Sequence, residues 1–428
     1  MKKRSYLFLL LLVLLLSVCS CASVVPTETG SAENEIGATP SEESEKTLKT
    51  LYEKAVSASE ENRLAYSYGL YSRLAAEGYE DSAKKAAGLR ASANATPISY
   101  VSLSVFDGFS DDSAVSDHAF IYADQNGTPR VLYAVAQGND TVAKEFVPDP
   151  TITGVISFKF DGLYYNKLCV CIKEDGSLRV FYSSKQVDSL VCDCNEGDKC
   201  PHELAKTYKS AILSMIPLLE GEKNVVDFII SSDGALDYAL IHSDNTASFY
   251  HKGAAYDDAI KQSGDFSDVV DFSYDQGNVG VSSRGTLINA NGKPALDPFK
   301  NVHMIDDYFI LDGGRAHYAI PGSSSIGEKE NAVYAASAFP AYFFISSDGT
   351  VYDSNDGKLG NSDKVALVYG SRLLYVDKKT TSVSVGYVIG TDGKLISMEL
   401  YDESAKDAWQ KTLFGALKNV TVNLGNKG

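Results

Sequence analysis

The chain has 428 residues, of which 44% are hydrophobic, and a formal net charge of −17 at pH 7. This length leaves room for a large domain and a small one. A strongly acidic protein is repelled by phosphate backbones, so nucleic acid is not expected among its partners.

A targeting segment is expected at residues 1–20. Basic residues Lys2, Lys3 and Arg4 precede a leucine run at 7–16 that is short for a membrane span. Cys21 then follows the small residue Ser20. This pattern resembles the lipobox of bacterial lipoproteins, which implies cleavage before Cys21 and lipidation of Cys21. We therefore expect a lipid anchor in the cell membrane, facing the extracytoplasmic side; an ordinary secretory signal is the alternative.

Residues 21–46 and 47–95 are expected to differ in order. The first stretch is rich in Ser, Thr, Glu and Gly with few apolar residues, which predicts a disordered tether. In the second, apolar residues recur at helical spacing, and Gly78 is placed to end a helix. The segment around Tyr79 and Asp81 resembles tetratricopeptide-like repeats of Gram-positive surface proteins. Because about one and a half repeats are present, we expect a helical hairpin that acts as a spacer, docks on the next domain or packs on a partner.

Residues 97–424 change to short apolar strands separated by turn dipeptides. Such dipeptides between alternating apolar positions are a strong hairpin signal, and seven occur: Asn126-Gly127, Asp175-Gly176, Asp244-Asn245, Arg284-Gly285, Gly313-Gly314, Asp348-Gly349 and Asp392-Gly393. With openings such as Val225-Val226-Asp227, the units resemble degenerate RCC1-like repeats. We predict a mainly β chain, a β-propeller of about seven blades. The alternatives are six or eight blades or a stacked β-sandwich pair. A late helix is expected over 402–417, and a strand over 419–423 that closes the propeller.

A cluster of possible metal ligands interrupts this pattern. Three cysteines and a histidine follow the spacing C-x-C-x5-C-x-H, which is the ligand set of a structural zinc site: Cys192, Cys194, Cys200 and His202. Strand-like runs precede the cluster, and a helix with its apolar face at Leu204, Tyr208, Ile212 and Met215 follows it. Residues 168–215 resemble the SWIM-type zinc finger, a ββα unit, and the resemblance implies that these four residues bind Zn²⁺. We expect the unit to be an insertion between two blades of the propeller or an elaboration of the second blade.

Disulfides are the competing interpretation of the cysteines. Five cysteines remain in the mature chain, an odd number, so they cannot all pair within it. Cys169 and Cys171 lie in an apolar run. They are either buried small hydrophobes or partners for the cluster in an oxidising compartment.

No catalytic motif is found, so an enzyme is not expected. The histidines at 118, 242, 251, 303 and 317 are single, and the pair Asp306-Asp307 suggests solvated loop charges. We predict a surface-anchored, non-enzymatic binding or scaffold lipoprotein that recognises a protein or cell-wall ligand. The alternative is an extracellular glycan hydrolase with carboxylates around the propeller axis.

Overall fold

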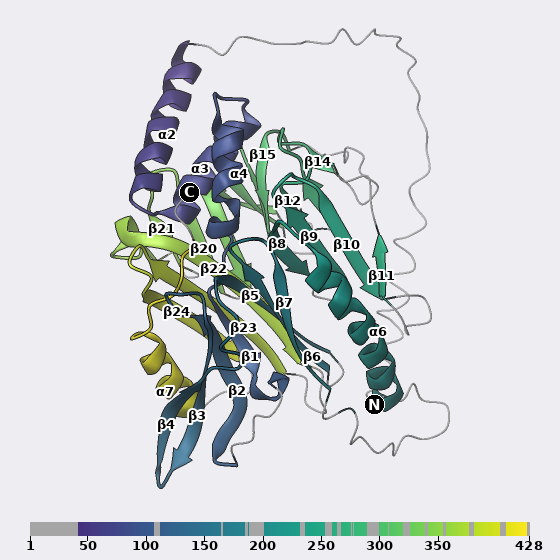
Figure 1. Cartoon of the computed structure of the whole chain (residues 1–428). Helices are drawn as coiled ribbons and strands as arrows, with labels where there is room; N and C mark the ends of the chain where they lie inside the picture. The colour runs from purple at the N-terminus through teal and green to yellow at the C-terminus, as the bar shows by residue number, and fades with distance from the viewer. Residues whose placement is uncertain are drawn as a thin grey trace, which may run out of the picture. The chain divides into compact units, whose positions relative to one another are not determined.

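Antiparallel strands dominate the computed structural model (Figure 1). It describes residues 42–106, 112–163, 166–184, 187, 201–231, 236–252, 259–262, 267–274, 276, 278–288, 299–306, 308–319, 326–338, 341–353, 357–375, 381–402 and 408–425. Lys46–Gly428 form one unit. None of the helices in these ranges has the length and apolar content that crossing a bilayer requires.

The described strands form seven antiparallel sheets, numbered here in chain order. Each sheet consists of strands that follow one another in the sequence. Sheets 1 to 3 contain β1 (Ile98–Ser102), β2 (Ala114–Ala123), β3 (Pro129–Gln137) and β4 (Asp140–Phe146); β5 (Val155–Leu163), β6 (Asn166–Lys173) and β7 (Leu178–Ser183); and β8 (Val225–Ile230), β9 (Tyr238–His242), β10 (Ala247–Lys252) and β11 (Ala259–Gln262).

Sheets 4 to 7 continue the same pattern. They contain β12 (Asp271–Ser273), β13 (Val279–Val281) and β14 (Leu287–Ile288); β15 (Val302–Ile305), β16 (Phe309–Asp312), β17 (Arg315–Ala319) and β18 (Ile326–Glu330); β19 (Ala332–Ala338), β20 (Ala341–Ser346) and β21 (Val351–Tyr352); and β22 (Val365–Tyr375), β23 (Thr381–Gly390) and β24 (Leu395–Asp402). All seven predicted turn dipeptides join the second and third strands of a sheet, one per sheet, so the hairpin predictions are confirmed.

Four of these turns also join a sheet to the next, from sheet 1 to sheet 5. A turn carbonyl accepts a hydrogen bond from the N–H group that opens the following sheet: Gly127 from Val155 (2.9 Å), Gly176 from Val225 (3.0 Å), Asn245 from Val269 (2.8 Å) and Gly285 from Val302 (3.0 Å). In three of these four links, a turn glycine and the residue before the valine adopt left-handed backbone conformations, as at Gly176 (φ 72°) and Asn224 (φ 57°). The repeated dipeptides therefore fix contacts between sheets as well as the hairpins themselves.

Helices α2 (Glu42–Glu60), α3 (Leu64–Ala76) and α4 (Ser82–Ala93) occupy the predicted helical region. Leu70 and Leu74 of α3 are fully buried in one core with Phe309 and Val333 of sheets 5 and 6. A side chain at Gly69 would have its Cβ 2.4 Å from the carbonyl oxygen of Val333, so a glycine permits this close approach. Of the alternatives for this segment, docking on the following sheets is the one found.

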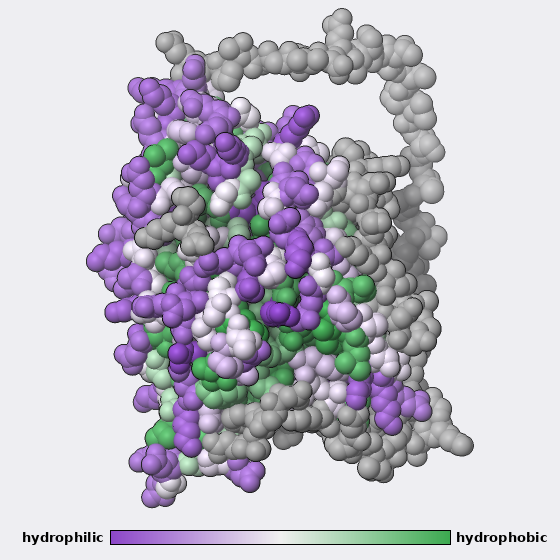
Figure 2. Space-filling model, in the orientation of Figure 1, coloured by the Kyte–Doolittle hydropathy of each residue, from purple (hydrophilic) through white to green (hydrophobic). Residues whose placement is uncertain are grey.

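Helix α6 (Pro201–Gly221) lies between sheets 2 and 3. Its buried residues Tyr208, Ile212 and Met215 pack with Leu168 of β6 and Phe228 of β8. The expected helical face is thus confirmed, and β6, β7 and α6 follow one another in ββα order. Figure 2 shows hydrophobic residues gathered on part of the visible face. Among the described residues, α6 carries two exposed leucines, Leu213 (49% exposed) and Leu218 (40%).

Three boundaries differ from the predictions. Helix α2 begins at Glu42, inside the segment expected to be disordered up to residue 46. Helix α7 (Ala408–Leu417) begins later than residue 402, because Asp402 is still paired with Val383 in sheet 7. Residues 419–423 form no named strand; Thr421 makes a single bridge to Lys394.

The C-terminal segment after α7 joins sheet 7 to sheets 1 and 2. Val422 donates its N–H to Gly393 of sheet 7 (2.9 Å), and Asn423 donates its N–H to Ala123 of β2 (3.2 Å). The Asn423 side chain also donates to the carbonyl of Val155 in β5 (3.2 Å). Strand β22 of sheet 7 contacts β5 directly. The last sheet therefore lies beside the first two.

Candidate functional site

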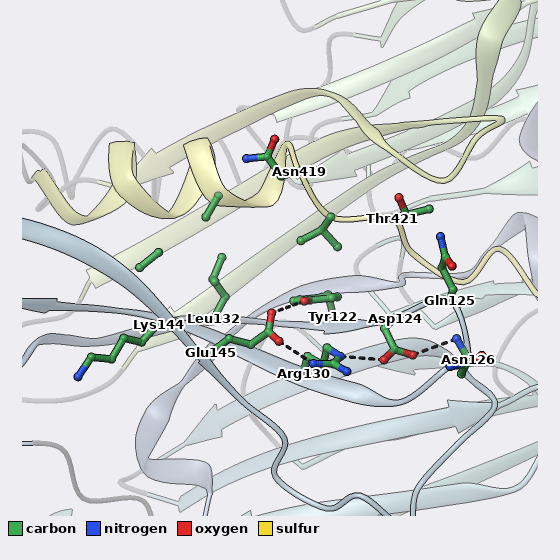
Figure 3. Close-up of a pocket in the computed structure, with 13 residues that line it drawn as sticks. Tyr122, Asp124, Gln125, Asn126, Arg130, Leu132, Lys144, Glu145, Asn419 and Thr421 are labelled. Atoms are coloured by element: carbon green, nitrogen blue, oxygen red, sulfur yellow. Dashed lines mark hydrogen bonds and ion pairs between the residues drawn. The ribbon is translucent and has the colours of Figure 1, made fainter.

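A cleft of about 620 Å³ lies between sheet 1 and the segment that follows α7 (Figure 3). Strands β2, β3 and β4 contribute Tyr122, Arg130 and Glu145, and the β2–β3 turn contributes Asp124. The volume is within the range of small-molecule sites in proteins. The remaining lining residues are Gln125, Asn126, Leu132, Ala143, Lys144, Ala416, Asn419, Val420 and Thr421.

Arg130, one of the residues that line this cleft, is held between two carboxylates. Its Nε donates to Oδ2 of Asp124 and its Nη1 to Oε1 of Glu145, each at 2.7 Å. The Tyr122 hydroxyl donates to the other oxygen of Glu145. These four side chains form a continuous hydrogen-bonded chain (Figure 3), so the guanidinium is oriented before any ligand arrives.

The protonation states in this chain follow from the same contacts. Burial acts to raise the pKa of Asp124, but hydrogen bonds from Arg130 and from the N–H groups of Thr128 and Asn126 outweigh it and lower the pKa. Hydrogen bonds to Asp124 and Glu145 raise the pKa of Arg130. Burial, then the bond to Glu145, raises the pKa of Tyr122. At neutral pH, Asp124 is therefore ionised, Arg130 is cationic and Tyr122 keeps its proton.

The predicted zinc and lipid positions lie outside the residues whose side chains are described. These are Cys21, Cys192, Cys194 and Cys200; His202 belongs to α6 by its backbone, but its side chain is not described. Among the side chains that are described, no group of three or more His, Cys, Asp or Glu is arranged to hold a metal ion.

Cys169 and Cys171 are free thiols on β6 and are fully buried. They share the core that contains Phe158 and Phe160 of the neighbouring β5. Burial, reinforced by a hydrogen bond with Cys169, raises the pKa of the Cys171 thiol. They fit the first of the two interpretations, buried small hydrophobes.

Several aspartates join neighbouring sheets near α4. Oδ2 of Asp271, on β12, accepts the N–H of Ile305 in sheet 5 at 2.9 Å. Asp306 accepts the N–H of Ser337 in sheet 6 at 3.1 Å, and Asp227 pairs with Lys159 of β5 at 3.5 Å. The interpretation of Asp306 as a solvated loop charge is therefore wrong, because its carboxylate is bound by the next sheet.

Among these interface aspartates, Asp271 has a raised pKa. Burial, opposed by the N–H group of Ile305 and reinforced by the charges of Asp227 and Asp306, raises its pKa to about 8. Only 7% of Asp271 and 8% of Asp227 is exposed. A protonated carboxyl near other carboxylates is a feature of glycosidases, but these groups are shielded from solvent.

Sequence reasoning missed the cleft. Its residues come from positions 122–145 and 416–421. The turn at Asn126-Gly127 was predicted, as was a closing role for residues 419–423. Nothing in the local sequence indicates that these two stretches form a cleft.

Comparisons with known proteins assign the chain to no family. No family model matches it, and no curated protein does. Among solved structures, a triple-arginine mutant of AofleA from Arthrobotrys oligospora is similar over 68% of this chain and 80% of its own, at 10% identity and a TM-score of 0.32. The SapL1 lectin in complex with alpha methyl fucoside is similar over 72% of this chain and 97% of its own, at 10% identity and a TM-score of 0.26. Both TM-scores are too low to support an inference.

Proposed function

We propose that this protein is a non-enzymatic binding lipoprotein, held on the outer face of a membrane by lipid on Cys21, and that the cleft over sheet 1 receives its ligand. The observation that carries the proposal is the cleft's preorganised chain of Tyr122, Glu145, Arg130 and Asp124. A fixed set of donors and acceptors lowers the entropy cost of recognising a polar ligand.

The chemistry of the cleft favours a hydroxyl-rich ligand, such as a cell-wall glycan. The carboxylates of Asp124 and Glu145 are balanced by the cations of Arg130 and Lys144, so the lining adds little net charge. The planar carboxylates and guanidinium of the cleft can each hydrogen-bond two adjacent hydroxyl groups of a sugar. The apolar side chains that line the cleft, including Leu132, suit the C–H faces of a sugar ring.

The proposed architecture is a seven-bladed β-propeller. Three observations support it: seven sheets of chain-consecutive antiparallel strands, turn carbonyls that bind the start of the next sheet, and contacts of sheet 7 with sheets 1 and 2. In a ring of blades, each sheet has two neighbours and no long edge is left unprotected.

A structural zinc ion held by Cys192, Cys194, Cys200 and His202 remains part of the proposal. The ββα order of β6, β7 and α6 supports it. Four protein ligands leave no open position for a substrate, so the zinc would stabilise the segment between β7 and α6.

The test is binding of the full chain, purified in detergent, to cell-wall polysaccharide measured by calorimetry. Arg130→Met removes both ion pairs, and we expect at least about a tenfold loss of affinity, or about 1.4 kcal/mol. Arg315→Met is the matched control. Arg315 forms an exposed ion pair with Glu330, with 3.5 Å between Nε and Oε1, and neither residue lines the cleft. Equal affinity of the two variants for the polysaccharide would remove the cleft from the proposal.

A glycan hydrolase is the alternative function, but the carboxyl group with the pKa of about 8, Asp271, is only 7% exposed and does not line the cleft, so the geometry favours binding. The same polysaccharide preparations, assayed for newly released reducing ends, separate the two functions. Release of reducing ends by the purified chain would replace the binding proposal with hydrolysis.

A further inference from the structure

A second, smaller cavity lies where the helices meet sheets 4 and 5. It has a volume of about 40 Å³, which exceeds the space that one water molecule needs. Helices α3 and α4 line it largely with alanines, and the opposite wall comes from the β13–β14 turn and the start of β15. The polar lining residues are Tyr68, Ser72, Arg90, Asn245, Ser282, Ser283 and His303.

Arg90 brings a positive charge to this cavity without a negative partner. Only 3% of the residue is exposed. Its Nη1 donates to Oδ1 of Asn245 at 2.9 Å, and its Nε has no hydrogen-bond partner. Among the described residues, no carboxylate forms an ion pair with Arg90. A buried cation compensated only by neutral groups is costly, and a bound anion removes that cost.

His303 supplies a second unsatisfied group in the same wall. It is 2% exposed, and neither ring nitrogen has a hydrogen-bond partner. Burial, then the positive charge of Arg73, lowers its pKa to about 3. The ring is therefore neutral at physiological pH and has one N–H group to donate, and the nearby Arg73 adds positive potential.

Small side chains keep the space open. Ala75, Ala76, Ala83 and Ala86 face it from the two helices, and Gly285 faces it from the turn. A larger residue at any of these positions would fill a cavity of this size. The combination of an unpaired buried guanidinium, a neutral imidazole, hydroxyl groups and a small volume matches a small anion with several acceptor oxygens.

We propose that this cavity binds a small tetrahedral oxyanion of the phosphate or sulfate type, with Arg90 as the principal ligand and His303 as a neutral donor. The anion would link the helices to the sheets beneath them. The site is separate from the cleft over sheet 1 and does not depend on the function proposed for that cleft.

The experiment titrates the full chain in detergent with inorganic phosphate, then with sulfate, at constant ionic strength in chloride. Thermal unfolding and calorimetry are the two readouts. We expect Tm to rise with the logarithm of oxyanion concentration above the dissociation constant, because the ligand binds only the folded state, and we expect the binding heat in calorimetry to saturate. Absence of both the rise in Tm and the saturable heat up to millimolar oxyanion would overturn the proposal.

Two variants localise the effect. Ala86→Leu fills the cavity but keeps Arg90, and we expect it to weaken phosphate binding by about tenfold or more. Arg63→Met is the matched control: Arg63 also lies at the helix–sheet boundary, where its Nη2 donates to the carbonyl of Gly349 at 3.0 Å, but it does not line the cavity. A phosphate response that is unchanged in Ala86→Leu, or lost equally in Arg63→Met, would place the anion elsewhere and overturn the assignment.

Discussion

At the scale of single residues, the turn glycines are constrained twice. Gly176 has a φ of 72°, which favours glycine, and a Cβ there would lie 2.5 Å from the Cα atom of Asn224 in the next sheet. Gly127 and Gly285 show the same combination against Gly154 and Asn301. The first constraint is visible in the sequence as a turn signal. The second is not, because the contacting residue belongs to another sheet.

Gly176→Ala is therefore expected to lower the free energy of unfolding by about 2 kcal/mol or more, since backbone strain and a steric clash add. Gly88→Ala is the control, because Gly88 lies inside α4 with nothing within 4 Å of the added methyl group. That change should stabilise the protein by up to about 1 kcal/mol. Denaturant unfolding of both variants gives the comparison, and equal stabilities would contradict the double constraint.

Asp271 predicts a pH dependence of stability with a definite sign. Its folded pKa of about 8 is above the ordinary value of 3.8, so between these values the folded state holds a proton that the unfolded chain lacks. The free energy of unfolding should fall as pH rises through this window, by at most about 1.4 kcal/mol per pH unit, and the loss should be complete above pH 8.

Asp271→Asn cannot ionise and should remove this slope. Urea titrations of both proteins between pH 5 and pH 9 measure the difference in slope, whatever constant offset the lost oxygen acceptor causes. Parallel curves for the two proteins would mean that Asp271 is already ionised at neutral pH in the folded state.

At the scale of elements, patterns confined to one stretch of chain were predictable and pairings between stretches were not. The seven hairpins and the apolar face of α6 follow from local periodicity and turn chemistry. The α7 boundary was missed because pairing with β23 keeps the chain extended to Asp402. The cleft was missed because Thr421 reaches Tyr122 only through the complete fold.

Helix α6 gives a prediction about the proposed zinc. Ile212, Met215 and Leu219 are buried between sheets 2 and 3, so the C-terminal half of the helix has its own apolar support. We expect about one zinc per chain, lost on Cys200→Ser or with a strong chelator. Hydrogen exchange should then increase at the N-terminal turns of α6 while protection around Met215 persists.

Elemental analysis together with a thiol titration under denaturant decides whether zinc is present. Met215→Ala is the control, because it removes buried apolar surface and should lower stability by about 2–5 kcal/mol with the metal retained. Because Cys169 and Cys171 are free, a chain without zinc and with three titratable thiols would instead have one disulfide within the cluster.

At the scale of the whole molecule, the seven sheets are built in the order of the chain. The C-terminal segment at residues 420–425 then joins the last sheet to the first two. Tyr387 of sheet 7 donates its hydroxyl to the carbonyl of Ile98 in sheet 1. Asn423 reaches Ala123, Val155 and Glu174 of sheets 1 and 2, while Val422 is bound to Gly393 of sheet 7. The C-terminal segment therefore acts as a connector between the last sheet and the first two, and it also forms one wall of the cleft.

Removal of residues 420–428 should destabilise the entire unit. Among the bonds lost are the four that Val422 and Asn423 make to sheets 1, 2 and 7, each contributing about 1 kcal/mol. The deletion also removes the buried side chain of Val422, which contributes about 1.5–3 kcal/mol. We expect a large fall in Tm together with loss of ligand binding at the cleft.

A point variant separates stability from the loss of the cleft wall. Asn423→Ala keeps Val420 and Thr421 in the chain but removes the two side-chain hydrogen bonds to sheet 2, so it should cost about 1–2 kcal/mol. Asn419→Ala, which loses only a bond to Gly415 within the same helical end, should cost about 0.5 kcal/mol or less. If both variants unfold at the same denaturant concentration, the C-terminal segment does not connect the sheets. If only Asn423→Ala is destabilised, closure of the series of sheets depends on these last residues.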